Sequence, residues 1–61
     1  MLKDLVDIDG LPVGINPDHV MSVDTITVRG QRVARVIMSD NLFYLIPEPT
    51  TKVINHLNRE D

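Results

Sequence analysis

The segment VDTITVRGQRVARVIM, residues 23–38, decides the fold class because it contains two β-branched runs around a glycine. Apolar and polar residues alternate toward the end of residues 19–28, as they do in a half-exposed strand. After a short connection at Arg29-Gly30-Gln31, a strand over residues 32–38 would have Ala34, Val36 and Met38 on one face and Val33, Arg35 and Ile37 on the other. The segment therefore predicts an antiparallel hairpin, and the fold class that follows is mainly β.

The preceding residues predict a second, shorter hairpin. Residues 5–8 read as a strand, Asp9-Gly10 suits a tight turn, and residues 12–15 return as a strand at a sheet edge or with a bulge. Residues 16–18 then turn the chain, because proline presets φ and the flanking Asn and Asp can bond nearby backbone. Val20 and Val23 break the alternation, which indicates a bulge or a short helical turn.

The last strand is predicted to have apolar side chains on both faces. After a turn at residues 39–41 it consists of Leu42, Phe43, Tyr44, Leu45 and Ile46. Because side chains alternate along a strand, one core can cover only half of them. The sequence therefore predicts that this strand is the interface of a homo-oligomer, with a dimer favoured.

A helix is expected over residues 50–58, since Pro47 and Pro49 end the strand and Thr50 or Thr51 can cap a helix. Its predicted apolar stripe consists of Val53, Ile54 and Leu57. The expected fold is thus α+β: a small antiparallel sheet or open barrel of about five short strands within residues 4–46, followed by one C-terminal helix.

The composition predicts one domain over residues 1–61. A chain of this size buries only about 60% of its unfolded surface, so an isolated monomer would be marginally stable. The chain has no cysteine, which suits a reducing compartment and predicts a cytoplasmic location. No apolar run reaches the roughly 20 residues that span a bilayer, and no secretory leader is expected at the N-terminus.

The residues for catalysis or metal binding are sparse. His19 and His56 are the only general bases for neutral pH, and neither Ser22 nor Ser39 lies in a nucleophile motif. The segment Asp7-Ile8-Asp9-Gly10 is similar to the opening of a calcium loop, but the later ligands are missing. We therefore expect no enzyme activity, no metal and no cofactor.

Arg29, Arg32 and Arg35 form the one concentrated charge feature of a chain whose net charge is −3. Arginine matches phosphate geometry, so these residues are the candidate nucleic-acid contact. The alternative is a solvated hairpin whose arginines balance the nearby Asp24 and Asp40. The chain contains one Phe and one Tyr, which is too few for a platform on which bases stack.

The sequence resembles the FlbD/SwrD-type small motility proteins over nearly its whole length. The resemblance rests on Ile8-Asp9-Gly10, on residues 16–24 (NPDHVMSVD), and on Tyr44-Leu45-Ile46-Pro47-Glu48 followed by Val53-Ile54. The sequence departs from that pattern in a longer stretch between Asp24 and Met38 and in its prolines before the helix. The resemblance implies a small non-catalytic bacterial or phage protein.

A more distant resemblance is to the CsrA/RsmA-type RNA-binding translational regulators, which have five strands and a terminal helix in an intertwined dimer. Gly30-Gln31-Arg32-Val33 is similar to their mid-chain Gly-x-x-Val, and residues 10–18 are similar to a second segment. The basic residue of their opening strand is replaced in Leu5-Val6-Asp7, and the late one is lost in residues 45–49.

Two functions therefore follow from the sequence. The first is a regulatory or protein-interaction module that acts as a homo-oligomer on a protein partner. The second is an RNA-binding regulator that uses the three arginines. Binding to random RNA or DNA that falls steeply with salt would distinguish the second from the first.

Overall fold

The computed structural model describes residues 2–59. It is mainly β, with two antiparallel sheets and one C-terminal helix, and the described strands do not close into a barrel. The elements are β1 (Lys3–Val6), β2 (Pro12–Ile15), a 3-10 helix (Pro17–His19), β3 (Val20–Val28), β4 (Gln31–Met38), β5 (Phe43–Ile46) and α1 (Thr50–Asn58). The fold class predicted from the sequence is confirmed.

The first sheet is the hairpin of β1 and β2, in which Lys3 is paired with Ile15 and Val6 with Pro12. The bounds expected for the first strand, residues 5–8, are wrong, because the strand begins at Lys3 and ends at Val6. Asp7 belongs to the loop that follows. The Asp7 carboxylate accepts hydrogen bonds from the amides of Asp9 and Leu11, at 2.9 and 3.0 Å, and so closes the loop.

The second sheet has the strand order β3-β4-β5. Of the two alternatives for the irregular stretch at Val20 to Val23, the bulge is confirmed, since the register shifts between Val20 and Ser22. The turn predicted for residues 16–18 is a 3-10 helix, Pro17–His19, with Asn16 as its N-cap. Arg29 and Gly30 form the two-residue turn from β3 to β4, and both have positive φ, 52° and 76°. That combination is the type I′ geometry that suits the twist of paired strands.

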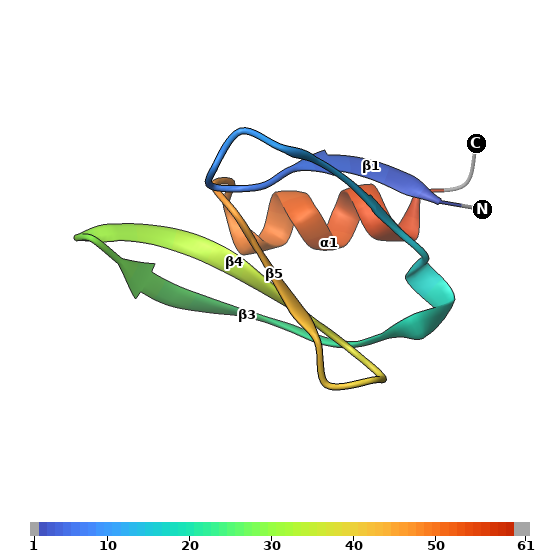
Figure 1. Cartoon of the computed structure of the whole chain (residues 1–61). Helices are drawn as coiled ribbons and strands as arrows, with labels where there is room; N and C mark the ends of the chain where they lie inside the picture. Colours follow the sequence, from blue (N-terminus) through green and yellow to red (C-terminus); the bar gives the residue numbers. More distant parts are fainter. Residues whose placement is uncertain (1, 60–61) are drawn as a thin grey trace.

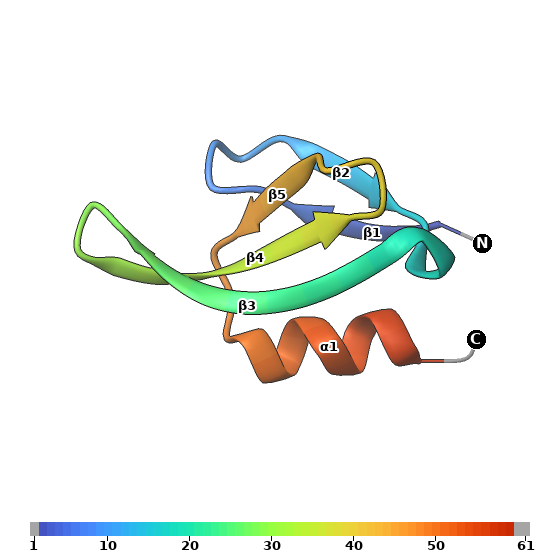
Figure 2. The same cartoon turned by 90° about the horizontal axis from the view of Figure 1, so that it is seen from below.

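The β1–β2 hairpin covers one face of the three-stranded sheet, and α1 lies along the β3 side (Figures 1 and 2). The core is formed between these layers. It consists of Leu5, Ile15, Ala34, Val36, Ile46, Val53 and Leu57. The Ile8 amide donates to the Leu45 carbonyl at 3.1 Å, which fixes the turn of the first hairpin against β5.

Helix α1 has the predicted bounds but neither the predicted cap nor the predicted stripe. Its N-cap is Pro49, and the Thr50 hydroxyl is instead directed toward the Asp24 carbonyl on β3, at 3.4 Å. Val53 and Leu57 are buried, whereas Ile54 is 37% exposed. Val53 and Leu57 are four residues apart and share the helix face that packs into the core, whereas the neighbouring Ile54 lies to the side of that face.

The end of α1 is attached to β1 by two polar contacts. The Lys3 ammonium donates to the Arg59 carbonyl at 2.6 Å, and Lys3 is itself buried. His56 Nε2 lies 3.1 Å from the Asp4 carbonyl. A cation at a helix C-terminus is favourable because the last carbonyls carry partial negative charge. Within residues 2–59, the structure contains no helix of the length and apolarity that a bilayer crossing requires.

Candidate functional site

The candidate site is the face of the three-stranded sheet that points away from the β1–β2 hairpin. We call it the outer face, and the pairing register assigns to it Ser22, Asp24, Ile26, Val33, Arg35, Ile37, Phe43 and Leu45. In Figure 2 this face is turned toward the viewer, and no other described element passes in front of it. It is therefore a sheet face with apolar side chains and without a covering layer in the single chain.

The outer face is organised in three cross-strand rows. One row contains Ser22, Ile37 and Phe43, the next Asp24, Arg35 and Leu45, and the third Ile26 and Val33. Phe43 is 55% exposed, and Ile26, Ile37 and Leu45 are half-buried. The charged residues thus lie in the middle row, between a row that contains Ile37 and Phe43 and a row that contains Ile26 and Val33.

Val33 is only 2% exposed, although it lies on the outer side of β4. It is not part of the main core cluster. Together with Pro47 and Pro49 it lines an open cleft of about 300 Å³ beside the hairpin. The outer face therefore contains one apolar side chain that is already fully buried within the single chain.

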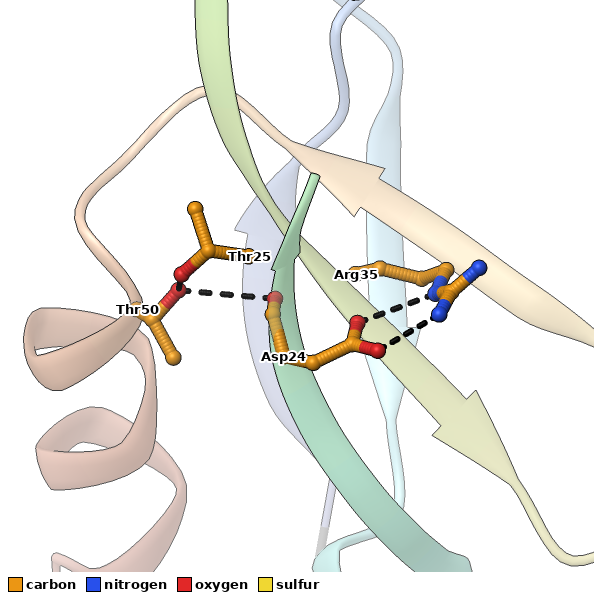
Figure 3. Close-up of polar contacts among 4 residues, drawn as sticks. All are labelled: Asp24, Thr25, Arg35 and Thr50. Atoms are coloured by element: carbon orange, nitrogen blue, oxygen red, sulfur yellow. Dashed lines mark hydrogen bonds and ion pairs between the residues drawn. The ribbon is translucent and has the colours of Figure 1, made fainter. Parts of the chain in front are cut away.

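Asp24 and Arg35 form a two-point ion pair across β3 and β4 (Figure 3). Arg35 Nε donates to Asp24 Oδ1 at 2.9 Å, and Arg35 Nη2 donates to Asp24 Oδ2. The hydrogen bonds from Arg35 lower the pKa of the Asp24 carboxyl, and those to Asp24 raise the pKa of the Arg35 guanidinium. Their side chains remain 44% and 34% exposed, so both charges are within reach of a partner.

The predicted interface strand is divided by the structure. Tyr44 and Ile46 face the chain's own core, and Ile46 has no exposed surface, so it is not available to a partner. Phe43 and Leu45 lie on the outer face, whereas Leu42 precedes the strand and is 59% exposed. The half of the strand that a single chain leaves without cover is therefore the Phe43 and Leu45 half.

The three predicted nucleic-acid contacts are not brought together. Arg29 lies in the hairpin turn, Arg32 is on the side of β4 opposite the outer face, and Arg35 is bonded to Asp24. The alternative from the sequence, in which the hairpin arginines balance Asp24 and Asp40, agrees with the structure for Asp24, although the sequence did not assign Arg35 as its partner. A two-residue turn at Arg29 and Gly30 places residue 28 opposite residue 31 and, by counting outward, residue 24 opposite residue 35.

The two histidines lie on different elements and have different contacts. His19 ends the 3-10 helix and is exposed, and His56 contacts the Asp4 carbonyl beside α1. In residues 2–59, no three His, Cys, Asp or Glu side chains are grouped as metal ligands would be. A cleft of about 390 Å³ between the first hairpin and the end of β4, lined among others by Leu2, Gly14 and Asp40, is open on the surface. His19 and Ser39 both line this cleft, where the Ser39 amide donates to the His19 carbonyl at 2.8 Å.

No protein-family model matches the sequence, and no curated protein and no solved structure is significantly similar to it. The outer face and the ion pair at its centre are therefore interpreted from their own chemistry.

Proposed function

We propose that this protein is a small non-catalytic regulatory or interaction module that acts as a homo-oligomer and uses the outer face as its contact surface. The observation that carries the proposal is that no described element passes in front of this sheet face in Figure 2, while Phe43 at its margin is 55% exposed. Antiparallel sheets tolerate one solvated face, but such a face is normally polar. Contiguous apolar side chains on a sheet surface mark an interaction site.

The size of the chain supports the same proposal. Its main core contains seven buried apolar residues in the described part. A core of that size supplies only a few kcal/mol of net stability, so covering a further apolar face on association adds a useful contribution. The absence of cysteine is consistent with work in the cytoplasm, where disulfides would be reduced.

Sedimentation velocity from about 1 µM to about 500 µM tests the proposal, because interfaces of modest area dissociate within that range. We expect the wild-type protein to shift from monomer toward a closed oligomer, and Phe43→Asp to remain a folded monomer throughout. Leu11→Asp is the matched control, since Leu11 is 59% exposed in the turn of the first hairpin and lies off the outer face. A wild-type monomer at every concentration would refute the proposal.

The alternative function, RNA binding, has less support in this geometry. Of the three arginines, Arg35 is neutralised by Asp24, and Arg32 and Arg35 lie on opposite sides of β4. Phosphate binding by such a set would depend on Arg29 and Arg32 alone. Titration of a labelled random RNA at low and high salt decides between the functions: tight binding with a steep salt dependence would favour the RNA regulator.

A further inference from the structure

The ion pair on the outer face is placed where a contact surface would normally be apolar. Asp24 and Arg35 occupy the middle row, with Ile37 and Phe43 in the row on one side and Ile26 and Val33 in the row on the other. Interface centres are generally depleted of charged residues. Any partner that covers the apolar rows must therefore also cover these two charges.

We propose, resting on the self-association proposed above, that a second copy of this chain docks face to face on the outer face and that Asp24 of each copy pairs with Arg35 of the other. The acid and the base lie directly opposite each other on neighbouring strands, so the face carries one charge of each sign. Such a face is complementary to its own two-fold image. The ion pair thereby sets the register of the dimer.

The symmetry axis that achieves this pairing is specific. A two-fold axis lying between the two sheets, parallel to the strands and midway between β3 and β4, places Asp24 over the partner's Arg35 and Arg35 over the partner's Asp24. The same axis places β3 over the partner's β4 and leaves β5 of each copy beyond the partner's β3, so Phe43 and Leu45 flank the overlap. An in-plane axis across the strands would instead place Asp24 over the partner's Asp24. Like charges facing each other cost free energy, so the second arrangement is excluded. The chosen axis also gives the aligned packing common in sheet sandwiches.

The charge pattern favours a second copy over other partners. A polyanion such as RNA meets the Asp24 carboxylate, which repels it. An uncharged apolar surface would bury Asp24 and Arg35 with only each other as partners, and covering charges without new partners is unfavourable. A second copy supplies each side chain with an additional opposite charge, which turns one ion pair per chain into a network of four charges.

The dimensions of the outer face set the strength of the dimer. About this axis β3 and β4 of one copy overlap β4 and β3 of the other, and three rows on two strands cover about 20 × 10 Å. Two such faces bury well under the roughly 1,200 Å² of a standard interface. The dimer is therefore a weak one that dissociates at micromolar concentrations, and the charge network matters for its orientation more than for its strength.

Two charge-reversal variants test the pairing across the axis. Asp24→Arg has two positive charges on the face and Arg35→Asp has two negative charges, so each variant should lose self-association by at least about tenfold. Mixed in equal amounts, they should form a heterodimer with the mass of the wild-type dimer. The doubly exchanged variant, Asp24→Arg with Arg35→Asp, should form homodimers as the wild type does and should retain the pair within the chain.

The outcomes separate the two proposals. If the wild type associates and both single variants associate equally well, the ion pair does not lie at the interface and this inference is overturned, while self-association stands. A mixture that stays monomeric has the same meaning, provided that circular dichroism shows both variants folded. If a reversal variant unfolds, Asp24→Asn and Arg35→Gln replace the reversals, and undiminished association of both then overturns the pairing. If the wild type is monomeric, the proposed function itself fails.

Discussion

The two faces of the three-stranded sheet differ in how they use the same residue types. On the side facing the β1–β2 hairpin, Ala34, Val36 and Ile46 have no exposed surface. On the outer face, Ile37 and Leu45 are adjacent to those residues in sequence but remain half-buried. Neighbouring apolar residues are thus fully buried on one face and partly exposed on the other, because the hairpin and the helix pack on one face only.

The largest effect that distinguishes the faces is expected in β5. Ile46→Ala should lower the free energy of unfolding by about 2–5 kcal/mol, because Ile46 is fully buried and its truncation leaves a cavity. Leu45→Ala is the matched control one residue earlier and should cost less than about 1 kcal/mol in the monomer, since Leu45 keeps contact with water. Urea unfolding at low protein concentration measures both. Equal losses would mean that the outer face is covered within the single chain.

Helix α1 extends the comparison to a second element. Leu57→Ala should lower the free energy of unfolding by about 2–4 kcal/mol. Ile54→Ala, on the more exposed side of the helix, should lower it by less than about 1 kcal/mol. The reason is that Leu57 is buried against the core whereas Ile54 is 37% exposed. Thermal and urea unfolding of both variants provide the measurement. A greater loss for Ile54→Ala than for Leu57→Ala would contradict the observed rotation of the helix.

A smaller effect is expected at the tip of the hairpin that carries both faces. Arg29 has a φ of 52°, a conformation that costs most residues about 1 kcal/mol and asparagine less. Arg29→Asn should therefore stabilise the monomer by about 0.5–1 kcal/mol, since Asn-Gly is the preferred type I′ pair. Gln31→Asn, just after the turn, is the control and should bring no gain. An unchanged or lower unfolding midpoint for Arg29→Asn would argue against the turn geometry.

The smallest effect concerns the ion pair on the outer face, whose side chains are partly exposed. Arg35 lowers the pKa of Asp24 below the ordinary 3.8, so the pair's contribution to stability is present above that pH and is lost as the pH falls through the lowered value. The stability difference between wild type and Asp24→Asn should be constant from pH 7 to pH 5 and shrink in stronger acid. A difference that grows on acidification would show that the Asp24 pKa is raised instead.

Local sequence signals predicted the elements well because each depends on neighbouring residues. The sequence predicted the bounds of β2, Pro12–Ile15, and of α1, Thr50–Asn58. It also predicted an irregularity around Val20, because the alternation of apolar and polar residues breaks there. The errors occurred where a polar side chain could hydrogen-bond to more than one backbone group. Asp7 closes a turn and so shifts the first strand, and Thr50 contacts β3 instead of capping its own helix.

The candidate site was predicted in part. The sequence identified residues 42–46 as a strand with more apolar side chains than one core can cover, and Phe43 and Leu45 are the ones left without cover. It also drew attention to Arg35, as one of three arginines that either contact nucleic acid or balance Asp24 and Asp40. The pairing of Arg35 with Asp24 depends on the hairpin register, which a turn counted one residue too long does not give.

The sequence by itself determined the strands, the helix and the excess of apolar side chains in β5, since alternation and turn residues are properties of a chain segment. Only the tertiary structure decided which face of the sheet is covered, because that depends on where the β1–β2 hairpin and α1 pack. It also decided that Asp24 and Arg35 meet in the middle of the open face, because contacts between distant residues are set by register and layering.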